Sequence, residues 1–211
     1  MSVKLNHTAE SVTTDTGDLE LITPANKTLL LNQVVWEDLR MPVNVVRVPT
    51  TAPPGWDAFK TGLEILWFDP DTDNQVYFAT QLPHAYKEGT NIVFHTHWTP
   101  AANGNLNEVV NWGLEYSWAN TGDDFPGTTT IYANAHIPTD ATLVADRHYR
   151  TDFAEISGAG KEISSILMGR FFRDADGSGG TDDYGDNAGL LEIDIHYQLN
   201  TLGSRQIATK T

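Results

Sequence analysis

The segment LLEIDIHYQL, residues 190–199, alternates apolar and polar side chains over most of its length. Successive side chains of a β-strand point to opposite faces, so this segment predicts a strand with one apolar and one polar face. The apolar face is expected to carry Leu191, Ile193, Ile195 and Tyr197, and the polar face Glu192, Asp194, His196 and Gln198. Such a strand is typical of an antiparallel sheet that covers a core with one side only.

Eight further segments have strand character and are bounded by Gly, Pro, Asn and Asp. They are VNVVRV (43–48), LEILWF (63–68), QVYFAT (75–80), NIVFHTHW (91–98), VVNWGLEYSW (109–118), TTTIYANAHI (128–137), RHYRTDFAEI (147–156) and ISSILMGRFF (163–172). Together they predict an all-β protein, an antiparallel β-sandwich. The long connections favour a jelly-roll-like sandwich over an immunoglobulin-like one, which needs only about 100 residues. Helix is expected only at Asp57–Lys60 and around residues 140–145.

The chain of 211 residues is long enough for one sizeable domain, which we expect at residues 36–211. Residues 1–35 are expected to form a short, fibre-like joining segment, because roughly the first 18 are mostly polar and bury little on folding. Two short apolar runs, Leu19–Ile22 and Leu29–Leu31, predict a small hairpin within this segment. A hairpin of that size would be steadied by copies from neighbouring subunits.

Charge and composition exclude several classes of partner. Lys and Arg number 13 against 28 Asp and Glu, and the formal net charge of -15 repels nucleic acid and anionic membrane surfaces. The chain has no Cys, so it offers neither a disulfide nor a thiolate metal site. The N-terminal residues lack the apolar core of a signal peptide, and no run of about 18 apolar residues occurs. We therefore expect neither secretion nor membrane insertion.

The most distinctive local pattern is a pair of histidines in one predicted strand. His95 and His97 lie two residues apart and therefore project from one face, while Phe94 and Trp98 project from the other. Two converging imidazoles are a candidate metal site. Together with Gly89 they match the first half of a cupin signature, but no Glu follows about four residues after the second histidine.

Three interpretations of this pair stay open. A cupin-like metalloenzyme would need further ligands, for which Glu115, Asp194 and His196 are candidates on other strands. In a homotrimer, three His-x-His pairs would place six nitrogens around the threefold axis, a closed cage for a divalent transition metal. In the third interpretation the two imidazoles are only hydrogen-bonded, at a half-buried face or a subunit contact.

The loop DADGSGGTD, residues 174–182, has the spacing of a calcium loop in its first part. Candidate ligands at positions one, three, five and nine are Asp174, Asp176, Ser178 and Asp182, with Gly179 at position six. Gly185 stands where a bidentate Glu is required, and the flanking segments are predicted strands, so an EF-hand is excluded. The alternatives are weak Ca²⁺ binding and an ordinary solvated Gly/Asp turn.

Aromatic residues are frequent, with 6 Trp and 7 Tyr. Alternation places Trp112, Leu114, Tyr116 and Trp118 on one strand face, which predicts that they belong to the core. Trp56 follows a Pro-Pro-Gly turn and is instead a candidate exposed ring for stacking on a sugar. No Gly-x-Ser-x-Gly elbow or phosphate-binding glycine loop occurs, and nothing in the sequence argues for catalysis.

Several separated segments together resemble a family of virion structural proteins of tailed bacteriophages, of the tail-fibre type. They are GDLELITPANKTLLLNQVVWEDLRMPV, QLPHAYKEGTNIVFHTHWTP, WGLEYSWANTGDDFP and LLEIDIHYQLNTLGSRQ, and the resemblance spans roughly residues 18–206. It implies a fibre-like N-terminal piece, a trimeric β-sandwich head and, at His95 and His97, a metal on the threefold axis. The implied location is the virion, assembled in the host cytoplasm.

The sequence thus favours a non-enzymatic, homotrimeric virion structural protein, of tail-fibre, spike or head-decoration type. Its expected partners are other virion proteins and host surface glycans, and its expected cofactors are at most a divalent transition metal or Ca²⁺. The first alternative is a carbohydrate-binding adhesin module with glycan-binding residues not identified. The second is the cupin-like metalloenzyme.

Overall fold

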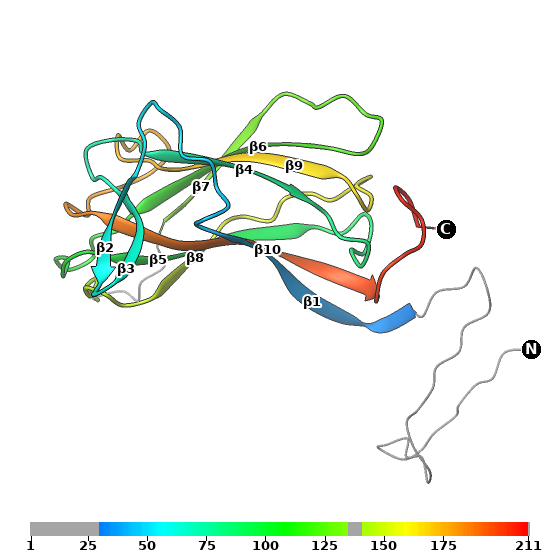
Figure 1. Ribbon diagram of the computed structural model, residues 1–211, viewed down its shortest axis with the longest axis horizontal. Helices are drawn as coiled ribbons and strands as arrows, with labels where there is room; N and C mark the ends of the chain where they lie inside the picture. Colours follow the sequence, from blue (N-terminus) through cyan, green and yellow to red (C-terminus); the bar gives the residue numbers. More distant parts are fainter. Residues whose placement is uncertain (1–29, 135–140, 211) are drawn as a thin grey trace, which may run out of the picture.

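Two antiparallel sheets packed face to face form the protein, as the computed structural model shows for residues 30–134 and 141–210 (Figure 1). The described ranges contain strands and no helix. The strands are β1 (Leu30–Pro42), β2 (Gly55–Lys60), β3 (Leu63–Phe68), β4 (Gln75–Gln81), β5 (Ile92–Pro100), β6 (Asn111–Ala119), β7 (Thr129–Asn134), β8 (Tyr149–Asp152), β9 (Ile166–Arg173) and β10 (Ala188–Thr201). In this part of the chain no helix is long and apolar enough to span a membrane.

The order of strands is that of a jelly roll. In the first sheet, called sheet A, the order is β2-β3-β10-β5-β8, and β1 also pairs with β10. In the second, sheet B, the order is β4-β9-β6-β7. From β3 to β6, each strand lies in the other sheet from the strand before it. Without β1 and β2, the sandwich consists of two four-stranded layers, β3-β10-β5-β8 and β4-β9-β6-β7. This winding confirms the expected all-β, jelly-roll-like sandwich.

The core between the sheets is largely aromatic. Trp112 of β6 stacks on Phe171 of β9 with ring centroids 4.9 Å apart, and Phe68 of β3 meets Trp112 edge-on at 5.4 Å. Trp98 of β5 is fully buried and donates its Nε1 hydrogen to Thr151 Oγ1 at 3.0 Å. Each fully buried ring of this size stabilises the fold by roughly 1.5–3 kcal/mol through removal of apolar surface from water. The predicted core face of β6 is confirmed, with Tyr116 only partly buried.

The alternation in β10 is interrupted once. The register against β5 shifts between Leu190 and Glu192, so a β-bulge lies at this point. Leu190, Ile193 and Ile195 are fully buried, whereas Leu191 borders a hollow on the outer face of sheet A. The prediction that Leu191 lies on the core face was therefore wrong, because the extra residue of the bulge reverses the alternation at this point. Asp194 and His196 lie on the outer face, as predicted.

The predicted strand at residues 43–48 is not a strand. Val45 N donates to Pro42 O at 3.0 Å in a turn, and only Arg47 pairs with a neighbour, Tyr77, through an isolated bridge. Proline has no backbone N–H, which makes Pro42 a natural place for the preceding strand to end. That preceding strand, β1, runs across residues 35 and 36, where the sequence predicts a boundary between segments.

The expected helix at Asp57–Lys60 is also wrong, because these residues belong to β2, which pairs with β3. Gly62 has φ of 79° in the tight connection between the two strands, a conformation that glycine adopts without strain. Pairing with an apolar neighbour outweighs the weak local preference for a helical turn. Residues 141–145 contain no helix either. Most of the predicted hairpin at Leu19–Ile22 and Leu29–Leu31 lies outside the described residues, which begin at residue 30. Residue 140 also lies outside them.

Candidate functional site

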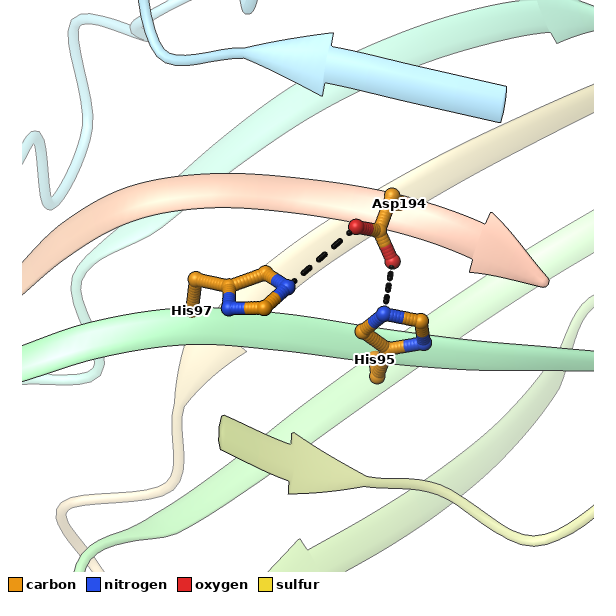
Figure 2. A group of neighbouring side chains, drawn as sticks. All are labelled: His95, His97 and Asp194. Carbon is orange, nitrogen blue, oxygen red and sulfur yellow. Dashed lines mark ion pairs between the residues drawn. The ribbon is translucent and has the colours of Figure 1, made fainter. Parts of the chain in front are cut away.

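The outer face of sheet A carries a cluster of histidines and carboxylates. His95 and His97 project outward from β5 and meet Asp194 of the neighbouring strand β10 (Figure 2). The strand register explains the meeting, since His95 lies opposite Asp194 on one side and opposite Asp152 of β8 on the other. We call His95, His97 and Asp194 the His–Asp cluster.

Distances within the cluster are short. Nε2 of His95 lies 2.5 Å from Oδ1 of Asp194, and Nε2 of His97 lies 3.3 Å from Oδ2. Asp194 is 3% exposed and His95 is 7% exposed, which is unusual for polar residues on the outer face of a sheet. In the part of the chain that the structure describes, Oδ1 of Asp194 has this close contact with His95 but no hydrogen-bond partner.

A further histidine orients His97. Nδ1 of His97 lies 2.6 Å from Nε2 of His148, so the opposite ring nitrogen, Nε2, faces Asp194. Burial lowers the pKa of His97, and the charges of His148 and His95 act in the same direction, against the raising effect of Asp194. His97 is therefore neutral at pH 7, the form of imidazole that can bind a metal.

Both arginines around the cluster already have acidic partners. Arg40 of β1 binds Glu192 through both oxygens at 2.6 Å, and Arg150 of β8 binds Asp152 at 2.7 Å. Neither arginine has an ion pair with Asp194 among the described contacts. Two hollows, of about 440 and 190 Å³, open beside His97 and beside His95. The cluster is thus reachable from solvent and rich in negative charge.

Of the three candidate completing ligands, Asp194 is the one whose ligand atom groups with both histidines among the described residues, while the ring of His196 lies 6.2 Å from that of His95. His196 lies on the same face, but its Nδ1 is 2.6 Å from Oδ1 of Asp38 and its ring stacks on Trp36 at 4.8 Å. Glu115 is on β6, in the opposite sheet. The sequence analysis did not single out His148, although it lies in the predicted strand segment 147–156, next to the start of β8.

In the predicted calcium loop, the first and last candidates have different surroundings. Asp174 and Asp176 come together with Asp73, whose carboxylate the sequence did not single out. Asp182 is instead held by Arg173 at 2.7 and 2.9 Å, and the Ser178 hydroxyl donates to Asp174 at 2.9 Å. These bonds account for the loop conformation without an ion, and Ca²⁺ binding there stays a prediction.

The outer face of sheet B holds a separate feature, a groove of about 740 Å³. Its lining comes from β4, β6 and β9 and from the β6–β7 connection, with Arg47 at one side. Tyr77 of β4, Met168 of β9 and Phe125 of the connection give it an apolar part, and the last two are 50% and 49% exposed. We call this feature the sheet B groove.

A polar network lies at the centre of the sheet B groove. Arg170 Nε donates to Glu115 at 2.8 Å, and its Nη1 donates to Gln75 Oε1 at 2.8 Å. The guanidinium also lies 4.1 Å from the centroid of the Phe172 ring. Hydrogen bonds from Thr128 and then from Arg170 lower the pKa of Glu115, so its carboxylate is ionised at neutral pH. Charged donors and acceptors are therefore held in place beside apolar surface.

The sequence analysis did not single out the sheet B groove. A signal existed, because alternation in QVYFAT puts Gln75 and Tyr77 on the face opposite Val76 and Phe78. Nothing local shows that this face joins Arg170. Trp56, the predicted sugar-stacking residue, is 48% exposed and borders a different hollow of about 480 Å³ together with Trp67.

No protein-family model and no curated protein matches the chain. Among solved structures, a match is the CBM22-1 and GH10 modules of Clostridium thermocellum endo-1,4-beta-D-xylanase 10B complexed with xylohexaose, at 10% identity and a TM-score of 0.35, covering 81% of this chain and 27% of that one. Another is TmCBM61 in complex with beta-1,4-galactotriose, at 10% identity and a TM-score of 0.32, covering 78% of this chain and 88% of that one. The chain thus spans about a quarter of the xylanase structure. Likeness at this level assigns no ligand to it.

Proposed function

We propose that this chain is a non-catalytic carbohydrate-binding domain that holds a glycan in the sheet B groove. The observation that carries the proposal is the arrangement of exposed apolar side chains around fixed polar groups in that groove. Tyr77, Phe125 and Met168 offer apolar surface, and the Arg170–Glu115 pair offers a charged donor and a charged acceptor. Concave sites with this mixture are the usual form of small-ligand sites.

Sugars match this chemistry in both respects. A pyranose ring has an apolar face of C–H groups that packs on aromatic rings, and hydroxyls that both donate and accept hydrogen bonds. Gln75 and Glu115 already hold the Arg170 guanidinium in place. The exposed polar atoms of these three side chains can therefore form hydrogen bonds with sugar hydroxyls without rearranging. Arg47 is exposed, and its side chain has no ion-pair partner within the described chain, so the groove also suits a sugar carboxylate.

The same residues argue against hydrolysis. Glycoside cleavage generally needs two carboxyl groups, one of them an acid whose pKa is raised. Of the residues that line the sheet B groove, Glu115 is the one acidic side chain, and its pKa is lowered. Binding without cleavage is therefore the activity that the groove supports best.

Binding to an array of neutral and acidic glycans tests the proposal, followed by calorimetry on any glycan retained. We expect Arg170→Met to weaken binding about tenfold or more, since a hydrogen bond to a charged group contributes about 1.5–3 kcal/mol. Tyr77→Ala removes an aromatic surface on which a sugar ring can pack and should weaken binding about tenfold. Trp56→Ala is the matched control, because it removes an exposed ring in another hollow. Thermal melts of each variant establish that the fold is kept. Absence of binding to any glycan, or loss only with Trp56→Ala, contradicts this groove as the site.

The resemblance to phage virion proteins suggests where such binding would be used. A homotrimeric fibre or spike head that recognises a host surface glycan would combine the two hypotheses. This part of the proposal rests on the sequence resemblance alone. Three grooves on one trimer would also raise the avidity for a repeating surface glycan.

A further inference from the structure

We propose that His95, His97 and Asp194 of one chain bind a single divalent transition-metal ion on the outer face of sheet A. The site is independent of the sheet B groove, since it lies on the other sheet of the sandwich. Figure 2 shows the two imidazoles of β5 and the carboxylate of β10 with their ligand atoms facing one another. All three candidate ligand atoms lie within 4.8 Å of one another.

The spacing fits one shared ion. Zinc binds imidazole nitrogen and carboxylate oxygen at about 2.0–2.2 Å, so two ligands of the same ion lie about 3.0–3.4 Å apart. The His97–Asp194 distance of 3.3 Å already has this value. The His95 contact is made to the other carboxylate oxygen, Oδ1, and its 2.5 Å has to open by about 0.5–0.9 Å for both groups to bind one ion.

The buried carboxylate of Asp194 contacts His95 and His97, but it has no ion pair with a lysine or arginine among the described contacts. Its Oδ1 has no aligned hydrogen bond in the described chain, and Asp194 is 3% exposed. Arg40 and Arg150, the nearby cations, are occupied by Glu192 and Asp152. A buried carboxylate without a permanently charged partner is costly, and a divalent cation between it and the two imidazoles lowers that cost.

The set of two nitrogens and one carboxylate oxygen selects the class of ion. Imidazole suits Zn²⁺, Co²⁺, Fe²⁺ and Ni²⁺, whereas Mg²⁺ and Ca²⁺ prefer all-oxygen sites. His148 holds His97 by its other ring nitrogen, which is the arrangement that commonly orients a metal-binding histidine. The hollow of about 440 Å³ beside His97 leaves a coordination position accessible to water.

This site differs in stoichiometry from a cage on a threefold axis. Three ligands from a single chain give one ion per chain, whereas six imidazoles from three chains give one ion per three chains. The number of ions per chain therefore distinguishes the two arrangements, whatever the oligomeric state.

The test is Zn²⁺ uptake by the full chain after chelator treatment, measured by calorimetry and by elemental analysis of the protein peak from gel filtration. Co²⁺ absorption gives a second readout that reports ligand geometry. We expect one Zn²⁺ per chain and a raised melting temperature. His97→Gln should abolish uptake, and His148→Gln should weaken it by about 10–100-fold, as expected for a residue that orients a ligand.

Asp194→Asn tests directly whether the carboxylate binds the ion. If this buried variant fails to fold, His97→Gln still tests whether the cluster is the Zn²⁺ site. The matched control is His84→Gln, which removes an imidazole that bonds Ser164 and the backbone of Ser204 instead. The proposal is overturned if Zn²⁺ is not taken up, if one ion is bound per three chains, or if His97→Gln binds Zn²⁺ as well as the His84 variant does.

Discussion

At the scale of single residues, Gly158 occupies a position where no other side chain fits. A Cβ atom added there would lie 1.8 Å from the backbone oxygen of Thr90 and 2.5 Å from the hydroxyl of Tyr86. That hydroxyl donates to the same oxygen at 2.5 Å, and burial raises the pKa of Tyr86 to about 12, so it stays a donor over the physiological range. Neither neighbour is free to move away, because one is backbone and the other is buried in the core.

We therefore expect Gly158→Ala to lower the free energy of unfolding by about 1–3 kcal/mol, as overpacking does in well-packed regions. Gly127→Ala is the matched control, since a Cβ at Gly127 meets nothing within 4 Å and its φ is not positive. Urea denaturation followed by fluorescence measures both. Equal stability of the two variants would show that the contact between Gly158 and Thr90 relaxes without cost.

At the scale of elements, one buried arginine holds the connection between β9 and β10. Arg173, the last residue of β9, is fully buried and makes two bonds to Asp182, at 2.7 and 2.9 Å. Its remaining hydrogens go to the backbone oxygens of Phe68, Asp186 and Tyr184. The connection thus folds around the guanidinium, which joins strands of both sheets.

Removing that guanidinium leaves a buried carboxylate and three carbonyl groups without their donor. We expect Arg173→Met to cost about 3–5 kcal/mol of stability, the loss typical of breaking a buried ion pair. Lys60→Ala removes an ion pair with Asp146 whose side chains are 50% and 46% exposed, and should cost less than about 1 kcal/mol. Chemical denaturation of the two variants gives the comparison, and similar losses would contradict the role assigned to Arg173.

At the scale of the whole molecule, two strongly exposed apolar residues lie at the end of the sandwich where β1 begins and β10 ends. Val34 of β1 is 64% exposed and Leu202, just after β10, is 78% exposed. The register pairs Leu30 with Thr201, so the start of β1 and the end of β10 lie side by side, as Figure 1 shows. Exposed apolar surface of this kind is a candidate contact between copies of the chain, as the predicted homotrimer requires.

Light scattering coupled to gel filtration tests the homotrimer. We expect three times the chain mass of 23.3 kDa, and a shift toward the mass of one chain in Leu202→Glu, because a buried unpaired charge opposes association. Leu106→Glu is the control, since Leu106 is 59% exposed and lies outside β1 and β10. The mass of a single chain at micromolar concentration would end the trimer hypothesis.

Local alternation along the chain was enough to establish the class of fold and the outward direction of His95, His97 and Asp194. That is a property of each strand separately, since side chains two residues apart share a face wherever the strand lies. The partners of these residues depended on long-range pairing. β10 lies beside β5 because the sandwich closes in jelly-roll order, and this choice selects Asp194 over Glu115 and brings Tyr77, Arg170 and Glu115 into one groove. The bulge at Leu191 and the β2–β3 pairing are likewise set by contacts between distant segments, whose energies no local pattern contains.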